Sequence, residues 1–139
     1  MATIELMSWE HARELASPIR YAVFVHEQRV PAEIELDEHD AVSLHAVAFE
    51  GRSAIGTGRL LPDGHIGRMA ILKEWRRRGV GAAILQALMD AARRRGDREV
   101  ALSAQVHAVA FYRAHGFQTL GDVYEEAGIE HQKMVRKLA

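Results

Sequence analysis

Short stretches of the chain alternate between apolar and polar residues, which is the pattern expected of β-strands. Residues 3–9 alternate weakly and form the first predicted strand. Residues 44–49 and 54–61 form two more, and the turn residues 50–53 between them predict a hairpin. Further strands are predicted over residues 65–72, 100–102, 117–123 and 131–138.

Apolar residues at helical spacing predict three helices, of which residues 81–95 form the clearest. Its apolar face consists of Ile84, Leu85, Leu88, Met89 and Ala92. The last turn of this helix is basic, and Gly96 stands where a C-capping glycine is expected. Weaker helical patterns cover residues 108–115 and residues 12–25, where Pro18 predicts a helix start or a kink.

The order of these elements predicts the class of fold. Strands come first, then a strand, a loop, a helix, a strand and a helix, and finally two more strands. Only the acidic segment 30–40 falls outside this scheme, and it is predicted to be a loop with a short helix. We therefore expect an α/β (α+β) domain with a mixed sheet, and the length of the chain predicts a single domain over residues 1–139.

Composition removes several classes of function. The chain has no cysteine, which excludes disulfides, thiolate metal sites and a cysteine nucleophile. Its formal net charge of −1 gives no reason to expect a nucleic-acid or membrane partner. We find neither the pattern of a signal peptide nor an apolar run long enough to span a membrane. These observations predict a soluble cytoplasmic protein.

The segment Arg76–Gly81 lies between a predicted strand and the clearest predicted helix. Gly79 and Gly81 allow a backbone to approach an anion closely, and the free N–H groups at a helix start attract negative charge. Three consecutive arginines add positive charge beside this site. A Walker A loop is excluded because no Gly-Lys-Ser/Thr follows, and the glycine spacing differs from that of dinucleotide-binding folds.

Taken alone, this loop is a weak signal. From average residue frequencies, a pattern of this kind occurs in on the order of one chain in seven of this length. A glycine-rich turn entering a surface helix therefore explains it equally well.

Two segments in sequence order resemble the signatures of the GNAT N-acetyltransferase superfamily. The first joins residues 66–72, the arginine-glycine loop and the helix 81–95. The second is residues 108–117, which end in Phe-Tyr, three further residues, and Gly-Phe. Other segments are similar to the ElaA/YjcF-like subgroup, namely residues 23–31, residues 37–40 with His45, residues 104–105 and residues 126–131.

This resemblance implies a GNAT fold, in which a mixed, mostly antiparallel seven-stranded sheet is flanked by about four helices and splayed at strands 4 and 5. It implies acetyl-CoA as co-substrate in that opening, with an amine of a small molecule or a peptide as the acceptor. The resemblance is also compatible with a homodimer.

The resemblance assigns roles to individual residues. The backbones of Met69, Ala70 and Ile71 would pair with the pantetheine arm, and Tyr112 would protonate the leaving thiolate. Gln105 would contact the cofactor from a position where many members of the family have asparagine. The amides that would cradle the pyrophosphate belong to Arg76, Arg77, Arg78, Gly79, Val80, Gly81 and Ala82.

The general base has three candidates, Glu27, His45 and His131, because the subgroup resemblance runs through all of them. Histidine titrates near neutral pH and can accept the proton of an ammonium group. We place Glu27 and His45 slightly ahead of His131. Each also has a purely structural explanation, as an ion pair, a core histidine or an exposed strand residue respectively.

No metal site is predicted, because the histidines lack a ligand spacing such as His-Glu-x-x-His. The acidic residues Asp37, Glu38 and Asp40 are expected either to form a rim that attracts a cationic amine or to be a solvated loop. An acetyl-CoA-binding module without turnover is the alternative to an enzyme. Acyl-homoserine-lactone synthesis is a third reading, from a faint similarity over residues 20–27, and the short chain disfavours it.

Overall fold

The first half of the chain forms an antiparallel sheet of four strands. The computed structural model describes residues 2–138, so the predicted domain 1–139 extends one residue beyond them at each end. The strands lie in the order β1-β2-β3-β4. Their bounds are β1 Thr3–Ser8, β2 Leu44–Glu50, β3 Ser53–Leu60 and β4 Ile66–Ile71. The predicted hairpin over residues 44–61 is confirmed, because β2 and β3 pair antiparallel.

The second half forms a three-stranded antiparallel sheet in the order β5-β7-β6. Its strands are β5 Glu99–Gln105, β6 Gln118–Glu126 and β7 Ile129–Lys137. β5 is longer than the predicted residues 100–102. Glu99 and the polar residues Ser103 and Gln105 also pair with β7, so they belong to the strand. Long-range pairing overrides the local pattern there.

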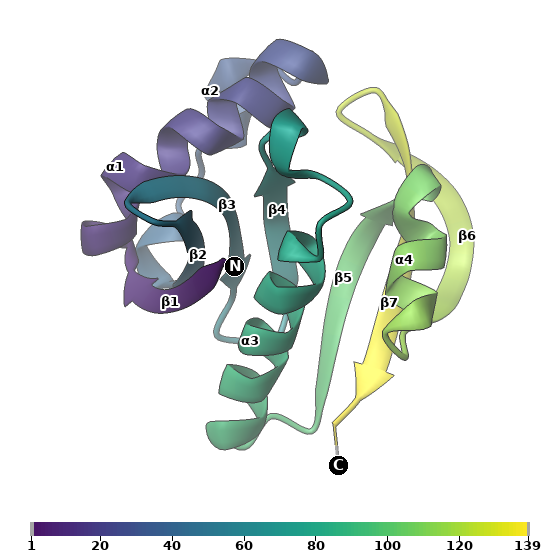
Figure 1. Ribbon diagram of the computed structural model, residues 1–139. Helices are drawn as coiled ribbons and strands as arrows, with labels where there is room; N and C mark the ends of the chain where they lie inside the picture. Colours follow the sequence, from purple (N-terminus) through teal and green to yellow (C-terminus); the bar gives the residue numbers. More distant parts are fainter. Residues whose placement is uncertain (1, 139) are drawn as a thin grey trace.

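The two sheets meet at one parallel bridge, between His65 and Ala101. There the Ala101 N–H donates to the Gly64 carbonyl at 3.1 Å. Beyond this point β4 and β5 diverge, as Figure 1 shows. The predicted seven-stranded sheet, splayed at strands 4 and 5, is therefore confirmed.

Helices cover both faces of the first sheet, and another packs on the second sheet (Figure 1). Against the first sheet lie α1 Trp9–Arg20, continued by a π-helix Tyr21–Glu27, and α3 Val80–Arg94. The short α2 Ala32–Glu35 packs on the π-helix, and α4 Val109–Ala114 packs on β5 and β6. Within residues 2–138, none of the helices is both long and apolar enough to cross a membrane.

The prediction that Pro18 starts the first helix is wrong, because α1 begins at Trp9 and continues through Pro18. Proline has no N–H, so one intrahelical hydrogen bond is missing at this position. One turn later the hydrogen bonding changes to the π-helical pattern of Tyr21–Glu27. The sequence did not predict this π-helix, although it carries Glu27 towards the arginine-glycine loop.

The core lies between α3 and the sheet. All five residues of the predicted apolar face of α3 are completely buried, which confirms that face. α3 lies close to β3 because Gly56 and Gly58 have no side chain there. A Cβ atom on Gly58 would stand 2.9 Å from Ile84 Cγ2, closer than real Cβ atoms come to their neighbours.

On the other face of the sheet, Arg20 anchors the segment that follows the π-helix. Its side chain is 1% exposed and donates to the Glu35 carboxylate at 2.5 Å. It also donates twice to the Asp40 carboxylate, at 2.8 and 3.1 Å. A buried guanidinium with two carboxylates holds α2 and the 3₁₀ turn after it against α1.

We predict that Arg20→Met strongly destabilises the protein, because it leaves the buried Glu35 without its cationic partner and Asp40 with Arg59 alone. Breaking a buried pair in this way costs about 3–5 kcal/mol of unfolding free energy. Urea unfolding at neutral pH measures the loss. The control is Arg13→Met, which changes an exposed arginine on the same helix and should shift stability by less than about 0.5 kcal/mol. Equal effects of the two substitutions would contradict the anchoring role.

Candidate functional site

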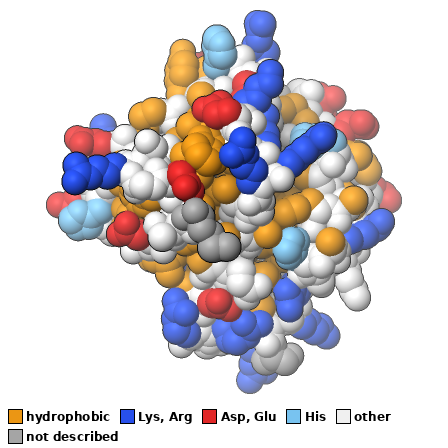
Figure 2. All heavy atoms as spheres, in the orientation of Figure 1, with side chains coloured by type: hydrophobic (Ala, Val, Ile, Leu, Met, Phe, Trp, Pro, Cys, Tyr) orange, Lys and Arg blue, Asp and Glu red, His pale blue; other side chains and the backbone are white. Residues whose placement is uncertain are grey.

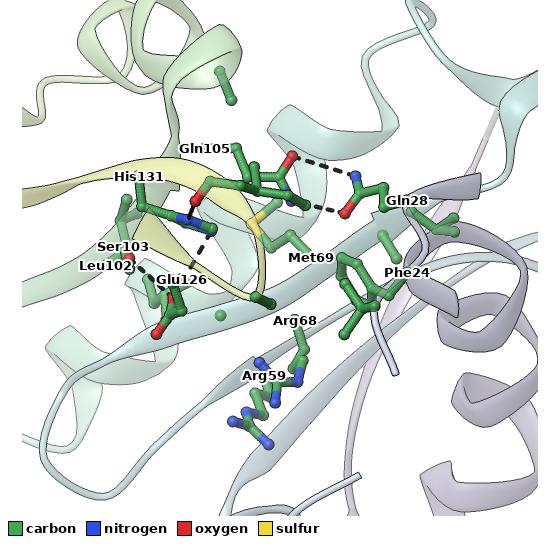
Figure 3. Close-up of a pocket in the computed structure, with 18 of the residues that line it drawn as sticks. Phe24, Gln28, Arg59, Arg68, Met69, Leu102, Ser103, Gln105, Glu126 and His131 are labelled. Carbon is green, nitrogen blue, oxygen red and sulfur yellow. Dashed lines mark hydrogen bonds and ion pairs between the residues drawn. The ribbon is translucent and has the colours of Figure 1, made fainter. Parts of the chain in front are cut away.

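A cavity of about 790 Å³ occupies the opening between β4 and β5. Strand β4, the π-helix and α2 contribute one side, and β5, β7 and α4 contribute the other. Met69, Ala70, Ile71, Gln105 and Tyr112, which were assigned to the site from the sequence, all line it. Figure 3 shows residues from both sides of this cavity.

At the β4 side, the strand carries a bulge. Arg59 pairs with Gly67 and Thr57 pairs with Ala70, so Arg68 and Met69 together face the single residue Gly58 of β3. Arg68 has a left-handed backbone with φ of 48°. A bulge leaves the extra residue outside the hydrogen-bond ladder, so backbone groups next to Met69 are available to a ligand.

The arginine-glycine loop leads from β4 into α3 and leaves the start of that helix open. The N-cap is Gly79, with φ of 81° and no side-chain capping hydrogen bond. A Cβ atom on Gly79 would meet nothing within 4 Å, so the space over the helix start is empty of protein. The first N–H groups of α3, from Val80 to Ala82, therefore face a space that suits a phosphate group.

Positive side chains surround this helix start. Arg76, Arg77 and Arg78 are all exposed, and Figure 2 shows Lys and Arg side chains gathered over the upper part of that face. Arg78 stacks over the Trp75 ring at 5.1 Å. The exposed arginines and open helix start fit a polyanion such as the pyrophosphate of coenzyme A.

Two residues that the sequence assigned to different roles form one ion pair. Arg76 donates to both carboxylate oxygens of Glu27, at 2.7 and 3.0 Å, and to the carbonyl of Ile71 at 2.9 Å. The hydrogen bonds and charge of Arg76 lower the pKa of Glu27. A carboxylate stabilised in its charged form is a weaker base. Arg76 lines the cavity, so this pair ties the π-helix to the end of β4 at its edge.

Tyr112 projects from α4 towards β4. Its Oη donates to Met69 Sδ at 3.7 Å, and its ring lies edge-on against Phe111 and Phe117. Burial raises the pKa of Tyr112 to about 12. The phenol therefore keeps its proton at neutral pH and remains a donor beside the β4 bulge.

His131 is the one proposed histidine base that lines the cavity. Its Nδ1 lies 2.7 Å from the carbonyl of Ile129, and because a carbonyl only accepts, Nδ1 carries the hydrogen. In the neutral ring, Nε2 is then left as a proton acceptor. Nε2 is 3.8 Å from a carboxylate oxygen of Glu126, so an acidic group stands beside it (Figure 3).

His45 lies elsewhere. It is 1% exposed on β2, its Nε2 is 2.9 Å from the carbonyl of Asp40, and its ring packs on Trp9. It does not belong to the residues that line the cavity. Burial lowers the pKa of His45, which keeps the ring neutral. Its surroundings are those of a core histidine with a hydrogen-bond partner.

Gln105 is paired across the opening. Its amide donates to Gln28 at 2.8 Å, and the amide of Gln28 donates back at 3.3 Å. Figure 3 shows this reciprocal pair, which joins the end of β5 to the residue that follows the π-helix. The sequence did not predict this partner, because Gln28 and Gln105 are 77 positions apart.

The predicted acidic rim is wrong for two of its three members. Asp40 is 2% exposed and bonded to Arg20 and Arg59. Asp37 accepts two hydrogen bonds from Arg59, at 2.7 and 3.0 Å, and one from Arg68 at 3.1 Å. Burial alone would raise the pKa of Asp37, but these arginines lower it to about 2. These acids compensate arginines and are not free to attract a cation.

Among residues 2–138, no group of three or more His, Cys, Asp or Glu side chains is placed to hold a metal ion. The site so described consists of a phosphate-binding helix start, a bulged strand, a protonated phenol and a histidine around one cavity. That combination suits the transfer of an acyl group from a phosphate-bearing carrier.

Comparison with known proteins identifies the family. The acetyltransferase (GNAT) domain model matches residues 10–138. The chain belongs to the GNAT acetyltransferase family. The resemblance of its two signatures to GNAT N-acetyltransferases is thereby confirmed, and with it the prediction that this GNAT chain is an acyltransferase.

Two curated relatives support the ElaA/YjcF-like subgroup. The chain is 41% identical over 122 residues to the uncharacterized N-acetyltransferase YjcF of Bacillus subtilis strain 168, across 85% of this chain and 87% of YjcF. It is 30% identical over 128 residues to protein ElaA of Escherichia coli K12, across 86% of this chain and 84% of ElaA.

Solved structures agree with this grouping. The crystal structure of Escherichia coli ElaA superimposes with a TM-score of 0.87 at 25% identity, covering 96% of this chain and 99% of that one. An acyl-CoA N-acyltransferase from Pseudomonas aeruginosa gives a TM-score of 0.87 at 29% identity, covering 98% of this chain and 99% of that one. The GNAT fold therefore extends over nearly the whole chain.

Proposed function

We propose that this GNAT acetyltransferase uses acetyl-CoA and transfers the acetyl group to a primary amine by direct attack of the amine on the thioester. The acceptor is a small molecule or a protein amine. The observation that carries the proposal is that Tyr112, the β4 bulge and His131 all line one cavity between β4 and β5. Arg76, in the loop that leads to the open start of α3, lines the same cavity.

Acetyl-CoA supplies the activated acyl group as a thioester. The backbone amides from Arg76 to Ala82 would hold its pyrophosphate, helped by the helix dipole and by the exposed arginines. The free edge of β4 from Met69 to Ile71 would pair with the extended pantetheine arm, as a strand pairs with a sheet edge. Gln105 would contact the same arm from β5 after its amide leaves Gln28.

Two groups would act on the thioester, one on its carbonyl and one on the leaving thiolate. A backbone N–H next to the bulge at Met69 would polarise the thioester carbonyl, since preorganised donors stabilise the charge that develops on oxygen. The Tyr112 hydroxyl would then protonate the leaving thiolate. Because its pKa is raised to about 12, the phenol holds its proton until a strong base forms beside it.

His131 is the base that the geometry favours. Its Nε2 is the free acceptor in a ring whose Nδ1–H is fixed by the carbonyl of Ile129. It would take the proton that the attacking amine loses, directly or through water, and Glu126 would stabilise the resulting imidazolium. Glu27 and His45 are less suited, since Glu27 is held by Arg76 and His45 lies outside the cavity lining.

Isothermal titration with acetyl-CoA, followed by thiol release against a panel of amines, tests the function. We expect saturable binding and thiol release that depends on the amine. Gly79→Val should weaken acetyl-CoA binding about tenfold or more, because φ of 81° suits only glycine and the loop must move. Gly51→Val, which strains a distant turn with φ of 61°, is the matched control. Failure to bind would overturn the proposal, and binding without turnover would favour an acetyl-CoA-binding module.

Tyr112→Phe is expected to lower kcat about a hundredfold or more, which is the usual contribution of a general acid. Acetyl-CoA affinity should stay nearly unchanged, because the ring remains in place. In the unsubstituted enzyme, activity should show no loss from tyrosine ionisation below about pH 10, given the raised pKa of Tyr112. Tyr21→Phe, at an exposed tyrosine of the π-helix, serves as control. A large fall in affinity for Tyr112→Phe would contradict its role as proton donor.

His131→Gln should reduce kcat/KM about a hundredfold, because the ring nitrogen that would accept the proton of the amine is lost. Rates of thiol release from acetyl-CoA decide this, with His11→Gln on the exposed face of α1 as control. Full activity of His131→Gln would exclude His131 as the base.

A further inference from the structure

Arg68 occupies an unusual position in the cavity wall. It is the residue of the β4 bulge with a left-handed backbone, a conformation that is uncommon outside glycine. Such backbone strain persists where the surroundings hold it, often at sites of function. In the sequence, Arg68 stands out only by its place in residues 66–72.

Arg68 and Met69 are consecutive and point to opposite faces of the sheet. Met69 contacts Tyr112, on the side where the leaving thiolate would be protonated. Arg68 instead reaches the carbonyls of Ile34 and Glu35 in α2, at 3.4 and 3.0 Å. Both residues line the cavity, so the cavity connects the two faces at the bulge. Arg68 therefore lines the cavity from the α2 side, across the strand from Tyr112.

The guanidinium of Arg68 is only partly compensated. Asp37 accepts one hydrogen bond from its Nη2, but the same carboxylate accepts two from Arg59. Its other contacts are neutral carbonyls, and its Nη1 has no partner among residues 2–138. The neighbouring Arg59 likewise has a buried Nε without a partner in the described chain. Donors outnumber acceptors here.

The open donor of Arg68 is accessible. Its side chain is 30% exposed, whereas the side chain of Arg59 beside it is only 7% exposed. Figure 3 shows the two arginines together on one side of the cavity, with His131 and Glu126 on another. Burial and the charge of Arg59 lower the pKa of Arg68, so a further negative group would stabilise its charged form.

We propose that Arg68 binds a carboxylate of the acceptor, so that the preferred acceptors are amines that also carry a carboxylate. The inference rests on the proposed function and names the substrate class for the same site. One free guanidinium nitrogen suits a singly charged group. Asp37, which bonds to Arg68, and Glu35, which lines the same wall, would repel a dianionic phosphate more strongly than a singly charged carboxylate.

The test compares amines that differ only in this charge. Glycine, β-alanine and γ-aminobutyrate are each paired with the corresponding carboxamide, and thiol release from acetyl-CoA is measured for each. Both members of a pair are assayed at the same pH, and kcat/KM is expressed per concentration of neutral amine, because a carboxylate and a carboxamide give the nearby amine different pKa values. We expect kcat/KM to favour the carboxylate about tenfold or more in at least one pair, the size of one charge-assisted hydrogen bond.

Arg68→Met should reduce this preference to about one, chiefly through KM for the carboxylate member, and Arg68→Lys should retain part of it. Arg52→Met, at an exposed turn, should keep the full preference. Circular dichroism checks that each variant is folded, and if Arg68→Met is not, Arg68→Lys and Arg68→Gln take its place. Equal kcat/KM within every pair, or a preference that survives the loss of Arg68, overturns the proposal.

A binding experiment separates this inference from the proposed function. The same pairs are titrated into the protein in the presence of coenzyme A, which requires no turnover. Tighter binding of the carboxylate member that depends on Arg68 supports the inference even if no amine is acetylated. Turnover of amines without any carboxylate preference would support the acetyltransferase proposal and contradict the proposed role of Arg68.

Discussion

The site depends on the fact that two neighbouring strands, β4 and β5, do not pair along their length. The segment that leads into β4 shares one bridge with β5, between His65 and Ala101, and the two strands then separate. The other neighbouring strands pair as antiparallel ladders, three of which contain a bulge or irregularity. Strand edges without a partner present free N–H and C=O groups, which normally invite another strand. Here the free edge lies inside the molecule and faces a cavity. The core around α3 holds the two halves together at one end, and the Gln28–Gln105 amide pair spans the opening.

The bulge at Arg68 and Met69 divides this opening between two tasks. Along a regular strand, side chains alternate between the two faces of the sheet. The extra residue of the bulge adds a local kink to β4. Met69 is thereby directed to Tyr112 and Arg68 to α2. In the proposed mechanism, protonation of the leaving group and recognition of the acceptor would therefore fall to neighbouring residues of one strand. Two residues in sequence thus serve two partners in space.

The sequence predicted what local physics decides and missed what distant contacts decide. The apolar face of α3, the hairpin and the arginine-glycine loop follow from spacing and turn chemistry within short windows, and all are present. The ion pair of Glu27 with Arg76 joins residues 49 positions apart, so no local pattern shows it. For the same reason the sequence ranked Glu27 above His131, which only β7 brings to the cavity. The π-helix was also missed, because its residues have the composition of an ordinary helix.

Arg68 belongs to a network of arginines and carboxylates around α2, where an apolar cluster could also have packed. Buried ion pairs lose much of their attraction to desolvation, and a well-packed apolar cluster of the same volume often stabilises a protein as well or better. Stability alone therefore does not account for three arginines and three carboxylates around α2. An apolar cluster could not hold a guanidinium in one orientation, whereas Asp37 and the carbonyls of α2 fix Arg68 through its Nε and Nη2 and leave Nη1 free. If Arg68 binds the acceptor as proposed, this network is the support that holds its side chain at the cavity wall, and Arg20 anchors the support to α1.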